Sequence, residues 1–104
     1  MIVEMREYLL KPKFPVETYI DRYRREGMEL QTRILGGLAG SYATEIGELN
    51  KLVTLWRYDG LGAREERRAQ LAAEPAWRGF VASVTPMFVS MNSTILRPTR
   101  IHPE

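Results

Sequence analysis

The fold is decided by residues 49–58, Leu49-Asn50-Lys51-Leu52-Val53-Thr54-Leu55-Trp56-Arg57-Tyr58. This run contains β-branched and aromatic residues but no Pro or Gly, and it ends at the turn signal Asp59-Gly60, which predicts a strand. Alternate side chains point to opposite faces of a strand, and both faces are apolar here: Val53 and Leu55 on one, Leu52 and Trp56 on the other. We therefore predict a strand that is covered on both faces, on one of them by helices.

The residues before this strand predict a strand, a helix and a second, irregular strand. Residues 2–10 alternate like a strand. From Pro15, apolar residues recur every three or four positions, which predicts a helix of about 15 residues with a kink or an end near Gly27. Three glycines within residues 36–40 weaken the next element. We predict a bulged strand over residues 40–46, followed by a hairpin turn.

The residues after residue 58 predict two helical segments and a last strand. Asp59 can cap a helix that carries Leu61, Arg64, Arg68 and Leu71 along one side. Pro75 begins a second helical segment with Trp77 and Phe80 at core spacing. Residues 87–96 form the last strand, and residues 97–104 form a tail.

The resulting order, β-α-β-β-α-β, predicts the ferredoxin-like α+β fold, in which helices cover one face of a four-stranded antiparallel sheet. We expect residues 1–104 to form one such domain. The open face of the sheet is predicted to carry Trp56 and Leu52, with Ile2 and Tyr8 beside them. An apolar open face marks an interaction surface, so we predict a homodimer that buries sheet against sheet.

Composition narrows the function classes. The chain has 44% hydrophobic and 27% charged residues, as soluble proteins do, and its lack of cysteine excludes disulfides and thiolate chemistry. No apolar run reaches the roughly 20 residues that span a bilayer, and the first residues do not resemble a signal peptide, so we expect a cytoplasmic protein. The net charge is +2, and residues 64–68 mix Arg with Glu like a solvated helix face, which disfavours nucleic-acid binding.

Several blocks resemble the NIPSNAP family. They are Met5-Arg6-Glu7-Tyr8, Leu30-Gln31-Thr32-Arg33, Thr44-Glu45-Ile46-Gly47-Glu48-Leu49-Asn50, Leu55-Trp56-Arg57-Tyr58-Asp59, Glu74-Pro75-Ala76-Trp77 and Ile95-Leu96-Arg97-Pro98. The resemblance covers nearly the whole chain and implies a dimeric α+β barrel, in which two ferredoxin-like subunits pack their sheets face to face. Eukaryotic members are associated with mitochondria and vesicle traffic. The small single-domain members have no generally assigned activity.

The chain departs from the family pattern at two places that bear on catalysis. Thr54 stands where many relatives have His, and Met91-Asn92-Ser93 stands where many have Gln-Glu-Asn. This chain lacks the acid–base pair that such a His and Glu would form. The resemblance therefore carries no acid–base mechanism over to it.

The main candidate site is a set of polar and aromatic side chains on the first, third and last strands: Glu4, Arg6, Tyr8, Thr54, Trp56 and Asn92. An Arg paired with a carboxylate and a Tyr hydroxyl suits an anionic or carbonyl-bearing ligand. The alternative is a hydrogen-bonded network at the dimer interface without a ligand, because buried charges require partners in any case.

Each of the other candidate sites has an alternative explanation that needs no ligand. Arg33, Arg57 and Arg64 are a candidate anion clamp, or simply solvated surface. Gly36-Gly37 and Gly40 could suggest a phosphate loop, although a predicted strand follows them and a bulge explains them. His102 is the only histidine and lies in the tail, so we predict no metal site and no cofactor.

Two function hypotheses follow. The favoured one is a homodimer, without assigned catalysis, that binds a small molecule or a partner in or near a cavity between sheet and helices. The alternative is a cofactor-independent monooxygenase-like or isomerase-like enzyme, with Arg6 orienting an anionic substrate and Tyr8 donating a hydrogen bond. This alternative rests on the fold, which does not determine function.

Overall fold

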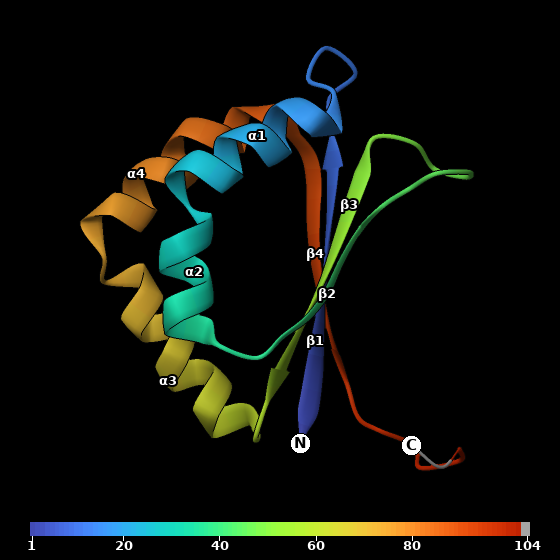
Figure 1. Cartoon of the computed structure of the whole chain (residues 1–104), viewed down its shortest axis with the longest axis vertical. Helices are drawn as coiled ribbons and strands as arrows, with labels where there is room; N and C mark the ends of the chain where they lie inside the picture. Colours follow the sequence, from blue (N-terminus) through green and yellow to red (C-terminus); the bar gives the residue numbers. More distant parts are fainter. Residues whose placement is uncertain (103–104) are drawn as a thin grey trace.

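A computed structural model describes residues 1–102 and confirms the predicted ferredoxin-like α+β fold (Figure 1). The elements are β1 (Ile2–Leu10), α1 (Val16–Glu26), α2 (Met28–Leu35), β2 (Leu38–Ala43), β3 (Lys51–Tyr58), α3 (Leu61–Ala72), α4 (Pro75–Val84), a short 3-10 turn η1 (Thr85–Met87) and β4 (Phe88–Leu96). The strands pair antiparallel in the order β2-β3-β1-β4. All four α-helices lie on one side of the sheet in Figure 1, which leaves the other side open.

The single helix predicted after Pro15 is two helices, α1 and α2, separated at Gly27. A Cβ at Gly27 would lie 3.0 Å from the Phe80 ring and 3.2 Å from the Trp77 ring, both on α4. The lack of a side chain at Gly27 therefore lets α4 pack closely against the junction of α1 and α2.

The glycines before β2 allow a close approach of two backbones and form no phosphate loop. Gly37 has a φ of 53°, and its carbonyl accepts a hydrogen bond from the Arg57 N–H at 2.7 Å. A Cβ at Gly37 would lie 2.3 Å from the Arg57 carbonyl oxygen, so this contact requires glycine. β2 covers Leu38–Ala43 rather than residues 40–46, and its register on β3 shifts between Leu38 and Gly40, an irregularity of the predicted kind at the start of the strand.

The helix-covered face of the sheet carries the side chains that were predicted for the open face. Glu4 lies opposite Trp56, and Tyr8 lies opposite Leu52. Trp56 is 1% exposed, Leu52 and Tyr8 are also buried, and Ile2 packs against the same core, so the prediction of an open face bearing these residues was wrong. Side chains alternate between the two faces along a strand, so the sequence sorts them into two sets. This alternation does not say which of the two sets the helices cover.

The open face carries the other set. In β1 and β3 this set includes Met5, Leu9, Val53 and Leu55, with Met5 paired to Leu55 across the two strands. These side chains are half-buried in a single chain. Both faces of the sheet are therefore apolar, as predicted. The set of side chains predicted for the open face lies under the helices, and the other set lies on the open face.

The start of α3 differs from the prediction. Asp59 does not cap α3, since Gly60 occupies the N-cap position and no side chain caps that helix. Over residues 1–102, no helix combines the length and hydrophobicity needed to cross a membrane.

Candidate functional site

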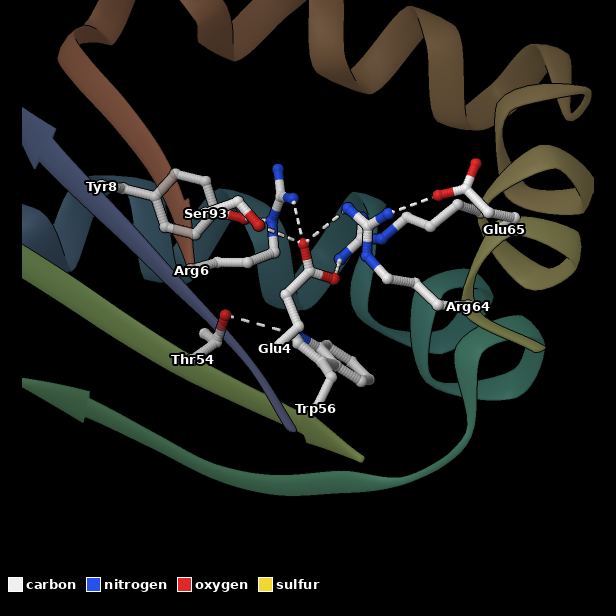
Figure 2. Close-up of polar contacts among 9 residues, drawn as sticks. Glu4, Arg6, Tyr8, Thr54, Trp56, Arg64, Glu65 and Ser93 are labelled. Atoms are coloured by element: carbon white, nitrogen blue, oxygen red, sulfur yellow. Dashed lines mark hydrogen bonds and ion pairs between the residues drawn. The ribbon is translucent and has the colours of Figure 1, made fainter. Parts of the chain in front are cut away.

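The centre of the candidate site is the buried carboxylate of Glu4, on β1 (Figure 2). Glu4 is 0% exposed. Its Oε2 accepts hydrogen bonds from Arg6 Nη1 at 3.1 Å, Arg64 Nη2 at 3.0 Å and the Ser93 hydroxyl, and its Oε1 accepts one from Arg68 Nη2 at 3.2 Å. Three guanidinium groups therefore surround one carboxylate.

Two of these guanidinium groups come from α3, whose charge pattern predicted a solvated face. Arg64 and Arg68 are one helical turn apart and both reach back to Glu4. The other three residues of the run, Glu65, Glu66 and Arg67, are exposed as predicted. The Glu65 carboxylate pairs with Arg64 Nη1 at 2.6 Å. The available signal was the position of both arginines on the same side of the helix as Leu71, which is buried.

The partners of Glu4 determine its protonation state. Burial alone would raise the pKa of Glu4, but hydrogen bonds from Arg64 and Ser93 and the charges of Arg68 and Arg6 outweigh it and lower the pKa from 4.5 to about 2. Glu4 is thus ionised at neutral pH and is a weak base.

The lowered pKa of Glu4 predicts acid sensitivity. A folded-state pKa below the unfolded value contributes stability that is complete above about pH 5 and is lost as the pH falls towards 2. We expect about 3 kcal/mol of unfolding free energy to disappear over this range. Urea unfolding of the wild type and of Glu4→Gln from pH 7 to pH 2.5 measures it; if the difference between the two proteins does not shrink in acid, the prediction is wrong.

Five of the six predicted site residues lie together on the helix-covered face, and the sixth does not. Arg6 Nε donates to the Tyr8 hydroxyl at 2.7 Å, and Trp56 Nε1 donates to the Thr54 hydroxyl at 3.2 Å (Figure 2). Asn92 pairs with Glu7 on the opposite face of the sheet, so its inclusion was wrong. Its neighbour Ser93, opposite Arg6, supplies the β4 contact instead.

A cavity of about 590 Å³ lies between this face of the sheet and the helices. Its lining includes four of the predicted residues, Arg6, Tyr8, Thr54 and Trp56, together with Arg68. Side chains from α1, α2 and α4 complete it, among them Tyr19, Tyr23, Gln31, Trp77, Phe80 and Val81. The volume is within the range of about 300–1,000 Å³ that is typical of small-molecule sites.

Aromatic rings form much of the cavity wall. Tyr19 packs within 6.3 Å of Tyr8 and within 5.2 Å of Phe88, measured between ring centroids. The Tyr23 hydroxyl donates to Gln31 Oε1 at 2.6 Å. Burial raises the pKa of Tyr23 to about 12 and raises that of Tyr19 as well. These phenols are therefore neutral hydrogen-bonding groups at physiological pH.

The structure does not bring the remaining sequence candidates together. Arg33 pairs with Glu29 on the exposed side of α2, and Arg57 lies on the other face of the sheet from Arg64, so the three arginines form no clamp. His102 is exposed. Across residues 1–102, no three His, Cys, Asp or Glu side chains lie close enough to hold a metal ion.

Known proteins resemble the chain in both sequence and structure. The NIPSNAP family model matches residues 3–103. Protein NipSnap of Drosophila melanogaster is 30% identical over 98% of the chain. The chain spans about a third or less of the length of the curated relatives it matches, 36% in the Drosophila protein and 18% in a Caenorhabditis elegans relative.

Among solved structures, a NIPSNAP-like domain protein from Burkholderia xenovorans, described as uncharacterized, is 39% identical with a TM-score of 0.91, over 99% of this chain and 89% of that one. An antibiotic biosynthesis monooxygenase, 11% identical with a TM-score of 0.65 over 95% of this chain and 99% of that one, shares the fold alone. The family match over nearly every residue, with the resemblance in structure, identifies the chain as a member of the NIPSNAP family.

Proposed function

We propose that this protein binds a small, largely apolar molecule in the cavity between the sheet and the helices. The observation that carries the proposal is the cavity itself, about 590 Å³ with mainly aromatic and aliphatic walls. Polar groups converge on one part of it, where Arg6 and Arg68 line it near the Tyr8 hydroxyl. An apolar pocket with a few convergent polar groups is the usual form of a ligand site.

The chemistry of these polar groups favours binding over acid–base catalysis. A general base works best with a pKa near the ambient pH, whereas the pKa of Glu4 is about 2 and its carboxylate is fully buried. Burial raises the pKa of Tyr19 and Tyr23, which makes them poor acids at neutral pH. A monooxygenase-like activity therefore has only the fold in its favour.

Fluorescence of the neutral dye N-phenyl-1-naphthylamine tests the binding proposal. We expect the dye to gain fluorescence in the wild type, because an apolar cavity excludes water from it. Val81→Trp fills the cavity from α4 and should weaken dye binding at least tenfold, whereas Ala82→Trp, at the exposed neighbouring position, should not. Thermal melts establish that both variants are folded. A wild type that does not bind the dye, or equal binding by both variants, would refute the proposal.

We propose also that two copies of the chain associate through the open sheet face. Met5, Leu9, Val53 and Leu55 form an apolar stripe along its two central strands. The Lys51–Glu7 ion pair, 3.0 Å long, crosses the same strands, so these two charges are balanced within one chain. A second copy fits such a surface, because two-fold dimers pair one patch with itself and are the commonest oligomers.

Leu55→Glu should convert this dimer to a monomer, because it places a charge within the stripe of both subunits. Native mass spectrometry reads the subunit count and also any small molecule retained in the cavity. Thr18→Glu, an exposed change on α1, should remain dimeric. A monomeric wild type, or a Leu55→Glu variant as dimeric as the wild type, would contradict this proposal.

A further inference from the structure

We infer that the molecule bound in the cavity is a hydrophobic monocarboxylate whose carboxylate pairs with Arg6 and Arg68. The inference rests on the proposed binding function and specifies its ligand class. Three observations carry it: the charge balance of the Glu4 cluster, the unused donors of the two arginines, and the apolar character of the rest of the cavity.

The charged groups of the Glu4 cluster have a net charge of one positive unit. Arg6, Arg64 and Arg68 surround the single carboxylate of Glu4, which leaves two surplus positive charges. Glu65, ion-paired with Arg64 at 2.6 Å, compensates one of them. Buried charges require partners, and one further carboxylate would make the cluster neutral. A phosphate dianion would leave it with an excess negative charge.

The surplus charge is on the cavity side. Arg6 and Arg68 line the cavity, and their side chains are 18% and 20% exposed, whereas Glu4 is out of contact with solvent. Arg64 does not line the cavity. A molecule in the cavity can therefore reach two of the three guanidinium groups.

Both arginines have donors that no protein group uses. Arg6 bonds through Nε to Tyr8 and through Nη1 to Glu4, which leaves Nη2 for a ligand. Arg68 bonds to Glu4 through Nη2, which leaves Nη1 without a partner among residues 1–102. Hydrogen bonds between such guanidinium donors and a charged acceptor are the strong ones, so a carboxylate suits them.

The rest of the ligand is expected to be apolar. Away from Arg6 and Arg68 the lining is mostly apolar and includes the rings of Tyr19, Trp77 and Phe80. Its other polar members are Arg24, Gln31, Thr32, Ser41, Thr54 and Thr85. Aromatic walls suit a flat ring system or a hydrocarbon chain. A carboxylate joined to an apolar body meets both requirements.

Competition against N-phenyl-1-naphthylamine at pH 7.5 tests the inference with three probes of the same ring system: 2-naphthoate, its neutral analogue 2-naphthamide, and 1-naphthyl phosphate, which is largely a dianion at this pH. We expect 2-naphthoate to displace the dye at least tenfold more effectively than either analogue. In Arg68→Gln the preference for naphthoate over naphthamide should fall to within about threefold, while the affinity for naphthamide should stay unchanged.

Arg64→Gln is the matched control. It also removes one donor from Glu4, so it carries a similar structural cost, but it lies outside the cavity lining and the charge that it removes is already balanced by Glu65. The preference for naphthoate should persist in it. An Arg64→Gln variant that loses the preference as fully as Arg68→Gln would overturn the assignment of the carboxylate to Arg68.

The experiment separates this inference from the proposed function. Equal displacement of the dye by naphthoate and naphthamide would overturn the inference and leave small-molecule binding in place. Stronger displacement by naphthyl phosphate than by naphthoate would overturn the single-charge requirement. A dye that does not bind the wild-type protein would refute the binding function, and the inference with it.

Discussion

Replacing Glu4 by Gln is expected to lower the free energy of unfolding by about 3–5 kcal/mol. Glutamine has nearly the same shape, so the change removes the charge and leaves little empty space. Arg6, Arg64 and Arg68 then lose the carboxylate that neutralises them in the interior. The cost arises mainly from guanidinium groups left uncompensated in a buried position.

Urea unfolding at pH 7 measures this loss, at one fixed protein concentration because the stability of the proposed dimer would depend on concentration. Glu29→Gln removes an exposed ion pair with Arg33 and should cost less than about 0.5 kcal/mol. The double variant Glu4→Gln/Arg68→Gln should be more stable than the sum of the single changes predicts, since the second removes a charge that the first leaves unpaired. A loss below about 1 kcal/mol for Glu4→Gln would contradict this account of the cluster.

Replacing Asn50 by Asp is expected to cost about 3 kcal/mol or more, because Asn50 joins the start of β3 to the connection between β1 and α1. Its Nδ2 lies 3.2, 3.1 and 3.0 Å from the carbonyl oxygens of Leu10, Lys11 and Phe14. Its Oδ1 accepts the Val16 N–H at 2.8 Å, at the first residue of α1. Aspartate keeps that acceptor but places a negative charge against three carbonyl oxygens.

Asn50 also has a φ of 64°, a conformation that few residues other than Gly and Asn adopt readily. Asn50→Gly retains this conformation and loses only the side-chain hydrogen bonds, so it should cost about 1–2 kcal/mol. Gln70→Glu makes the same amide-to-carboxylate change at an exposed position and should stay within about 0.5 kcal/mol of the wild type. If Asn50→Asp is no less stable than Asn50→Gly in urea unfolding, the carbonyl contacts contribute little.

The role of Asn50 was not predicted from the sequence, for a physical reason. Its partners in the chain lie 34 to 40 residues away, and nothing within residues 49–58 signals them. The strand prediction began at Leu49, whereas β3 begins at Lys51, immediately after the left-handed backbone of Asn50. A local pattern predicts a strand well, but not a hydrogen bond to a distant loop.

The sequence determined the order of the elements, because hydrophobic period, proline and glycine act within a few residues of each other. It also sorted the side chains of each strand into two sets, with Glu4, Arg6 and Tyr8 together on β1 and Thr54 and Trp56 together on β3. The pairing register of β1 and β3 puts these two sets on a common face. Only the tertiary structure decided which set lies under the helices, and the register of β4 on β1 put Asn92 on the opposite face. It also brought Arg64 and Arg68 to Glu4 across 60 or more residues. Periodicity is a property of one element, whereas a buried charge cluster depends on how several elements pack.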